Sequence, residues 1–152
     1  MPLAPQAMRD PSSMLMRSAP ERLVEVGEKC LALDQVRESL VVTQQPSCGM
    51  VMLQVREPVR RERFYLGEVL VTKCEVRLGA ARGWAMVDGD NPHAALAAAI
   101  CDAVSRTDSA ELSSLRAGIR ELCEETAARL LTEERDSWSQ VVETRVQFEE
   151  FE

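Results

Sequence analysis

The side chain with the widest chemical repertoire is His93, because the 152-residue chain contains no other histidine. It follows the turn at residues 88–92 (DGDNP), in which Asn91 is a suitable N-cap and Pro92 a suitable first helical residue. His93 is therefore expected in the first turn of a helix, where it could orient a phosphate-bearing ligand or accept a proton. A structural role at this junction, or a contact with a partner chain, is the favoured interpretation.

Arginine side chains form the second group that could bind a ligand. Four of them lie in the segment 56–63 (REPVRRER), and guanidinium groups suit the oxygens of a phosphate or triphosphate. Two glutamates interrupt the run, and no glycine-rich phosphate-binding loop accompanies it. A solvated surface, or an ion pair with an acidic partner, is therefore favoured over a phosphate site.

The other candidate groups are poorly placed for catalysis. Asp88 and Asp90 are better explained by the turn, whose backbone angles Asp and Asn tolerate, and Asp102 is either a buried acceptor or exposed. The chain has no serine-nucleophile motif, no G-x-G-x-x-G, no H-E-x-x-H and no cysteine–histidine pair with a local signature. Its five cysteines are widely spaced without a C-x-x-C pair, which indicates neither a metal site nor disulfides. The sequence therefore assigns no catalytic residue.

The segment 63–78 (RFYLGEVLVTKCEVRL) is the strand around which these residues are arranged. Alternate residues from Leu70 to Leu78 are mostly apolar, whereas Lys73, Glu75 and Arg77 between them are charged. This period of two predicts a half-buried strand. A short strand at 83–87 and a helix at 92–104 follow, and the small residues on one stripe of that helix allow close approach of another backbone.

The remaining elements complete a predicted α+β fold with a small, mainly antiparallel sheet in the order α-β-β-β-β-α-α-β. Ser12 and Ser13 could cap a turn, Pro20 opens a helix, and a strand from Val36 to Val42 is followed by a turn at 46–49 and a second strand at 50–55. A helix capped at 107–109 would reach Asp136, about 40 Å long, so it either bends near Gly118 or projects. A final strand is predicted at 141–151, and residues 1–152 are expected to form a single domain with a flexible or partner-docked tail at 1–11.

These segments also resemble a known family. RFYLGEVLVTKCEVRL, followed by GWAMVDGDNPHAALAAAICDAV, is similar to the core of the PhnG subunit of the bacterial carbon–phosphorus lyase system. Residues 18–20 (SAP) and 144–148 (TRVQF) are similar as well, so the resemblance runs in order along nearly the whole chain. The residues that carry it in the core are Arg63, Phe64, Gly67, Glu68, Val76, Arg77, Leu78, Gly89, His93, Ala94, Asp102 and Ala103.

The resemblance implies an accessory, non-catalytic subunit of a bacterial transferase, α-D-ribose 1-methylphosphonate 5-triphosphate synthase. That complex makes its product from ATP and methylphosphonate with release of adenine. The catalytic centre is then expected on partner chains of the PhnH, PhnI and PhnJ type, two copies of each. An iron–sulfur cluster and S-adenosylmethionine belong to a partner and ATP is a substrate of the complex, so no cofactor is expected on this chain. The residues to test first are His93, Arg63 and Arg77.

The composition of the chain limits the classes of function that it can have. A net charge of −7 argues against a nucleic-acid or anionic-membrane binder, and no apolar run is long enough to cross a bilayer. The N-terminus lacks the apolar core of a signal peptide, and unpaired cysteines favour the cytoplasm. Apolar surface on the long helix and the last strand favours an obligate subunit. Two alternatives remain: a stand-alone module that binds a phosphorylated metabolite, and an enzyme that depends on His93 alone.

Overall fold

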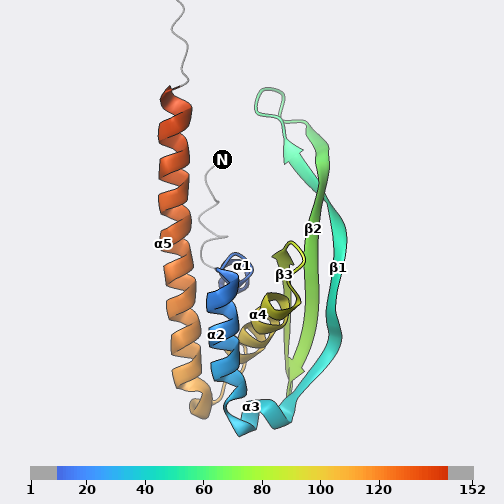
Figure 1. The fold of residues 1–152 in the computed structure, drawn as a ribbon, viewed down its shortest axis with the longest axis vertical. Coiled ribbons are helices and arrows are strands. Elements are labelled where there is room, and N and C mark those ends of the chain that lie inside the picture. The colour runs from blue at the N-terminus through green and yellow to red at the C-terminus, as the bar shows by residue number, and fades with distance from the viewer. Residues whose placement is uncertain (1–9, 144–152) are drawn as a thin grey trace, which may run out of the picture.

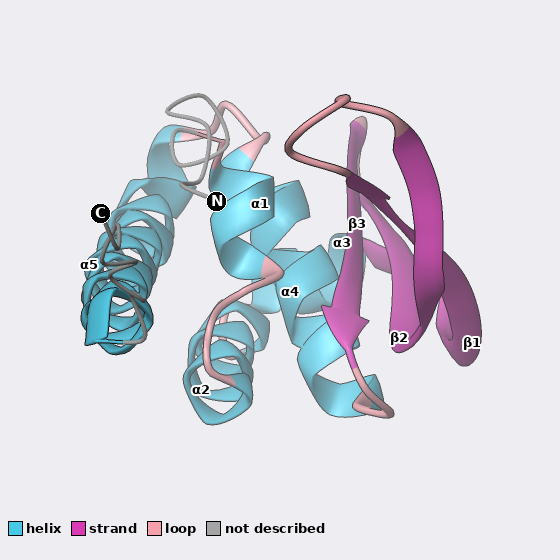
Figure 2. Ribbon diagram, turned by 90° about the horizontal axis from the view of Figure 1, so that it is seen from above, coloured by secondary structure: helices cyan, strands magenta, loops and turns pink. Residues whose placement is uncertain are grey.

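The computed structural model describes residues 10–143, and within them the fold is α+β, as the sequence predicts (Figure 1). Three strands form one antiparallel sheet, and the helices lie on one side of it (Figure 2). The elements are α1 (Pro11–Leu15), α2 (Pro20–Leu31), α3 (Asp34–Ser39), β1 (Leu40–Arg56), β2 (Arg63–Leu78), β3 (Ala81–Asp88), α4 (Pro92–Ser105), a 3₁₀ turn (Ala110–Leu112) and α5 (Ser113–Glu143).

The sheet has the order β1-β2-β3, and its three strands differ in length. β1 and β2 pair from Leu40 opposite Leu78 to Arg56 opposite Arg63, whereas β3 pairs only with the half of β2 from Val71 to Leu78. The β1–β2 hairpin therefore continues well past the end of β3 (Figure 1).

Two predicted features of the first strands are wrong. The predicted turn at 46–49 lies inside the single strand β1, so the two strands expected before residue 56 are one continuous strand. Pro46 fits in β1 because β1 is an edge strand and its register with β2 shifts between Gln44 and Ser47. At that position no backbone carbonyl of β2 needs the N–H that proline lacks. Val36, predicted in a strand, lies in α3, where it is fully buried.

Helix α4 is the centre of the core, packed between the sheet and α2 (Figure 2). The predicted inner face of β2 is confirmed from Thr72 to Leu78, where alternate residues are buried, but Leu70, predicted on the same face, is 41% exposed because β3 does not extend beside it. The predicted close approach at α4 is also confirmed. A Cβ on Gly83 of β3 would lie 2.1 Å from the carbonyl oxygen of Ala99, and one on Gly27 of α2 would lie 2.8 Å from Cβ of Ala97. Small residues therefore set the spacing of three layers.

Helix α5 runs unbroken for 31 residues, which corresponds to about 46 Å. Its first half packs on the core through Ile119, Leu122 and Thr126, and its second half projects past the core in the same direction as the hairpin (Figure 1). Of the two predicted outcomes, the helix therefore projects. The predicted strand at 141–151 is wrong at its start, since Val141–Glu143 ends α5, and the rest of it lies outside the described residues.

Two helix starts, those of α1 and of the segment before α5, differ from the predicted caps. Asp10, rather than Ser12 or Ser13, caps α1 by accepting a hydrogen bond from the backbone N–H of Ser12 at 3.2 Å. Ser109 makes no side-chain cap, and the guanidinium of Arg116 binds the backbone carbonyls of the predicted cap region instead. Residues 1–9 of the predicted tail lie outside the described residues. Within residues 10–143, no helix is long and apolar enough to span a membrane.

Candidate functional site

Asp102 lies at the centre of a buried polar network and is almost fully shielded from solvent. Its carboxylate accepts hydrogen bonds from Ser12 Oγ at 2.7 Å, from the backbone N–H of Trp84 at 3.1 Å and from Arg106 Nε at 3.0 Å. Arg106 also donates to Ser12 Oγ at 2.9 Å. Of the two options open for Asp102, the buried acceptor is correct. Because its partners come from α1, from β3 and from the residue that caps the C-terminus of α4, the network holds the fold together.

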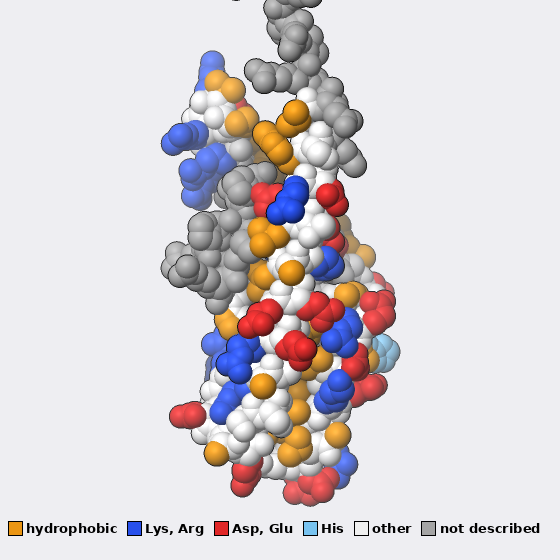
Figure 3. Space-filling model, turned by 90° about the vertical axis from the view of Figure 1, so that its left-hand side faces the viewer, with side chains coloured by type: hydrophobic (Ala, Val, Ile, Leu, Met, Phe, Trp, Pro, Cys, Tyr) orange, Lys and Arg blue, Asp and Glu red, His pale blue; other side chains and the backbone are white. Residues whose placement is uncertain are grey.

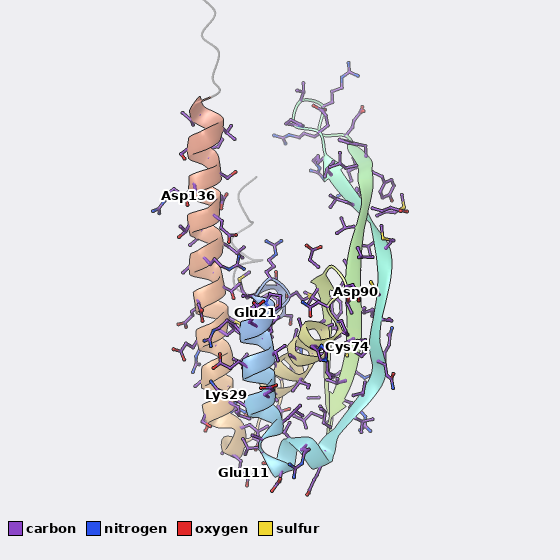
Figure 4. All side chains as sticks on the ribbon, in the orientation of Figure 1. Glu21, Lys29, Cys74, Asp90, Glu111 and Asp136 are labelled. Atoms are coloured by element: carbon purple, nitrogen blue, oxygen red, sulfur yellow. The ribbon has the colours of Figure 1, made fainter. Side chains whose placement is uncertain are left out.

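The turn before α4 is built as the sequence predicts. Asn91 Oδ1 accepts from the backbone N–H of Ala94 at 3.3 Å, which confirms Asn91 as the N-cap. Thr72 Oγ1 donates to the carbonyl of Gly89 at 2.7 Å and accepts from the N–H of Asn91 at 2.9 Å, so β2 fixes the turn. Gly89 has a φ of +76°, a conformation that favours glycine. The turn, marked by Asp90 in Figure 4, is thus explained by structure alone.

His93 follows this turn in the first turn of α4 and is exposed, as the spacing predicts. It borders a shallow hollow of about 180 Å³ between α2 and α4, whose other walls are mostly apolar, including Val24 and Leu96. No hydrogen bond or ion pair of His93 occurs within the described residues. The imidazole has no orienting partner of the kind that a general base uses.

The three residues marked for testing do not converge on one site. Arg63 and Arg77 stand at opposite ends of β2, 14 residues or about 45 Å apart along the strand. His93 borders the face of α4 that packs against α2, whereas Arg77 belongs to the face of the sheet opposite α4. A phosphate site that combines these three side chains is therefore not formed in this structure.

The described part of the chain offers little for metal or covalent chemistry. Among residues 10–143, no group of three or more histidine, cysteine or acidic side chains could hold a metal ion. All five cysteines are free thiols. Burial, with Glu75 nearby, raises the pKa of Cys74 to about 11, and burial also raises the pKa of Cys123 to about 11. At neutral pH these thiols are protonated and poor nucleophiles.

The feature that stands out is the part of the β1–β2 hairpin beyond β3, here called the hairpin arm (residues 50–70). It extends about 26 Å past the paired end of β3, and its β2 strand has a neighbour on one side only in the described structure. Met52 and Leu53 are successive residues and therefore point to opposite faces, yet both are exposed. The large apolar side chains exposed on this arm are Met50, Met52, Leu53, Val59, Phe64, Tyr65, Leu66 and Leu70.

The second half of α5, here called the helix arm (residues 127–143), is the matching feature. Figure 1 shows it rising on the far side of the molecule from the hairpin arm, and Asp136 marks its projecting part in Figure 4. Trp138 is 66% exposed on it, and Leu131 and Val142 are about half exposed. Isolated exposed apolar side chains are ordinary, but two projecting arms that both carry them indicate surfaces made for a partner.

The arginine-rich segment forms the loop that closes the hairpin arm. Glu57 organises this loop: its carboxylate accepts from the backbone N–H groups of Val59 and Arg60 at 2.5 and 2.6 Å. The backbone N–H of Glu57 donates to the backbone carbonyl of Glu62 at 2.9 Å. The arginines themselves are exposed, and Figure 3 shows basic side chains gathered at this end of the molecule. The result is a positively charged tip on an apolar arm, in agreement with the favoured solvated or partner-facing interpretation.

Sequence reasoning did not predict the hairpin arm, although one signal was available. In the first half of β2, Phe64, Tyr65 and Leu66 are apolar in succession, so the alternation that marks a half-buried strand is absent there. Such a segment either lies between two layers or is covered by another chain. In this structure neither layer is present, and Leu66 is 62% exposed.

Comparisons with known proteins agree with the arrangement of an associating subunit. The model of the family described as phosphonate metabolism protein PhnG matches residues 8–151, nearly the whole chain. A curated protein of Rhizobium meliloti (strain 1021), named alpha-D-ribose 1-methylphosphonate 5-triphosphate synthase subunit PhnG, is 31% identical over 126 residues. That match covers 81% of this chain and 78% of the relative.

Proposed function

The chain belongs to the PhnG family, and on that basis we propose that it is an accessory, non-catalytic subunit of an α-D-ribose 1-methylphosphonate 5-triphosphate synthase. Such a complex joins ATP and methylphosphonate with release of adenine, as a step in alkylphosphonate use by bacteria. The chain would act in the cytoplasm, in two copies, beside partner subunits of the PhnH, PhnI and PhnJ type. Its own contribution is to bind and order those partners.

The exposed apolar surface of the two arms is the observation that carries this proposal. Burial of apolar area is the main favourable term in association, at roughly 25 cal/mol per Å². Met52 is 60% exposed on the hairpin arm and Trp138 is 66% exposed on the helix arm, and neither side chain contributes to the core of its own chain. Aromatic residues and methionine are also the types enriched at the centres of interfaces.

Charge supports a directional contact. From residue 56 to residue 82, which includes the hairpin arm, there are seven basic and four acidic residues. From residue 107 to the C-terminus there are five basic and twelve acidic residues. The arms themselves also differ in sign: residues 50–70 contain four basic and three acidic residues, and residues 127–143 contain two basic and four acidic residues. Such a difference steers and orients a partner more than it strengthens binding.

The chemistry is proposed to reside on partner chains. His93, Arg63 and Arg77 are separated in this structure, and the described side chains form no group that could ligate an iron–sulfur cluster. In this proposal the cluster, the S-adenosylmethionine and the binding site for ATP belong to the partner subunits. This separation also counts against a stand-alone module that combines the arginines with His93. The lack of an orienting partner for His93 within the described residues counts against an enzyme that depends on it alone.

Co-expression with the candidate partner subunits tests the proposal. We expect a tag on this chain to co-purify a stable complex that releases adenine from ATP and methylphosphonate, while the isolated chain does neither. Met52→Glu and Trp138→Glu, one on each arm, should reduce the yield of complex by at least tenfold. Ala117→Glu, at an exposed position on the packed half of α5, is the matched control and should leave the yield unchanged.

Two results would overturn the proposal. One is a wild-type chain that remains monomeric in the presence of every candidate subunit. The other is calorimetric binding of ATP or methylphosphonate to the isolated chain that His93→Ala abolishes, which would favour the stand-alone module.

A further inference from the structure

The face of the sheet opposite α4 carries a group of side chains that the arms do not explain. Arg77 of β2 lies directly opposite Arg82 of β3, and Glu75 lies directly opposite Trp84. Because their neighbours Val76, Gly83 and Ala85 point into the core, these four side chains point to the uncovered side. We call Arg77, Arg82 and Trp84 the Arg–Trp face.

The two arginines of this face lack carboxylate partners. Arg77 donates to the backbone carbonyl of Gly79 at 3.0 Å, and Arg82 makes no hydrogen bond or ion pair within the described residues. Glu75, the acid beside them, is already paired with Lys73 at 2.8 Å. Like charges directly opposite each other on neighbouring strands destabilise a sheet. The Arg77–Arg82 pair therefore lowers the stability of the fold, and no contact within the described residues offsets this cost.

The Arg–Trp face is also concave, and the strand that carries it is held firmly in place. Together with Thr43, which lies at the register shift of β1, its residues line a hollow of about 410 Å³. Trp84 is 41% exposed there, while its backbone N–H is held by Asp102 on α4. The strand behind the hollow is fixed by the close contact of Gly83 with α4. Two guanidinium groups and an indole are therefore presented on a firm support.

We propose that the Arg–Trp face docks an acidic segment of a partner subunit, with a carboxylate between Arg77 and Arg82 and an apolar side chain against Trp84. This inference rests on the proposed function, since the partner is a subunit of the same synthase. Arginine and tryptophan are the residues most enriched among those that dominate binding energy at interfaces. A guanidinium group can bind a carboxylate through two parallel hydrogen bonds, and a second guanidinium beside it adds to the attraction.

A polypeptide fits this face better than a small anion such as a nucleoside triphosphate. Small-molecule sites enclose most of their ligand, whereas this hollow lies on an uncovered sheet surface. Glu75 also lines the hollow and would repel a triphosphate. A protein segment that places a single carboxylate between Arg77 and Arg82 would be repelled less, because Glu75 is already paired with Lys73.

The test compares Arg82→Glu with Arg120→Glu in the binding of this chain to its partner subunits. Arg120 is an exposed arginine on the packed half of α5 that, like Arg82, has no ion pair in the described structure, so the charge change is the same. Binding of the immobilised chain to purified partner subunits is measured by biolayer interferometry at several salt concentrations. We expect Arg82→Glu to raise the Kd at least tenfold and Trp84→Ala to raise it by a similar factor. Arg120→Glu should change it less than twofold.

Each other result has a defined meaning. Equal Kd values for Arg82→Glu and Arg120→Glu, with wild-type binding intact, would refute the docking face and leave the proposed function standing. Failure of the wild-type chain to bind any subunit would refute the proposed function itself. Binding of ATP to the isolated chain that Arg82→Glu abolishes, or self-association that it abolishes, would assign the face to a nucleotide or to a second copy and overturn the inference.

Discussion

Replacing Gly83 by alanine is the sharpest test of how this core is built. A Cβ at this position would lie 2.1 Å from the carbonyl oxygen of Ala99, 2.5 Å from the backbone nitrogen of Ala103 and 2.7 Å from its Cβ. Carbon atoms normally approach other heavy atoms no closer than roughly 3.5 Å. Two of the three obstacles are backbone atoms of a helix, so no side-chain rotation can relieve them. β3 and α4 must separate by about 1 Å or more.

The cost follows from what that separation breaks. Overpacking a core costs about 1–3 kcal/mol. Moving α4 away also lengthens the hydrogen bond from the N–H of Trp84 to Asp102, now 3.1 Å, and an unsatisfied buried donor costs about 1–3 kcal/mol more. Alanine recovers roughly 0.4–1 kcal/mol by restricting the unfolded chain. We therefore expect Gly83→Ala to lower the free energy of unfolding by about 3 kcal/mol, and the melting temperature by roughly 6–12 °C.

Gly118→Ala is the matched control, because the same atom added in α5 meets nothing within 4 Å. There the replacement should raise the free energy of unfolding by about 0.5–1 kcal/mol, since glycine is unfavourable inside a helix. Urea unfolding followed by circular dichroism, at low micromolar concentration to limit association, measures both. A Gly83→Ala protein within 1 kcal/mol of the wild type would refute the contact between β3 and α4 described above.

Three further predictions concern single side chains. Asp102→Ala should lower the free energy of unfolding by about 1–3 kcal/mol in the same urea assay, because it leaves the N–H of Trp84 unpaired, and a neutral result would contradict the network. Since burial raises the pKa of Cys74 from 9.0 to about 11, the folded state should be fully favoured below pH 9 and lose stability as the pH rises through 11. Cys74→Ala should remove that part of the pH dependence in unfolding curves, and an unchanged dependence would rule out this thiol. His93→Ala should change stability by less than about 0.5 kcal/mol and spare adenine release by the assembled complex, whereas lost activity would restore a catalytic role.

The sequence was sufficient to predict the elements whose causes are local. The alternation of β2, the cap at Asn91 and the small-residue stripe of α4 each depend on a few neighbouring side chains, and all three are present. The turn at 46–49 was predicted wrongly because proline and glycine usually end a strand. Only the position of β1 at the sheet edge, a tertiary fact, allows Pro46 to remain in the strand.

The candidate site was harder to predict because its residues are defined by position rather than by type. Arg77 and Arg82 are five residues apart and become neighbours only through the register of β2 and β3. Likewise, the apolar run that includes Leu66 shows that the alternation is lost there, but it does not reveal that β3 stops short and leaves the hairpin arm uncovered. Side chains that contact a partner are apolar in the same way as those of a buried segment. The sequence of one chain does not show whether its own core or another protein covers them.

The residues that carry the family resemblance fall into two groups, those explained by the fold of this chain and those on its exposed surface. Val76, Leu78 and Ala94 lie in the core, Ala103 contacts Gly83, and Asp102 holds the buried network, so these positions are explained by folding alone.

Gly89 is likewise explained by the turn before α4, whereas Phe64, Arg63 and Arg77 have no such role within the described residues. Phe64 and Arg63 lie exposed on the hairpin arm, and Arg77 lies on the Arg–Trp face. If these side chains served a ligand of the isolated chain, they would have to converge, yet Arg63 and Arg77 are about 45 Å apart along one strand. A surface that long suits another protein, and it explains why a chain with so few reactive groups would retain aromatic and arginine residues at the edges of its fold.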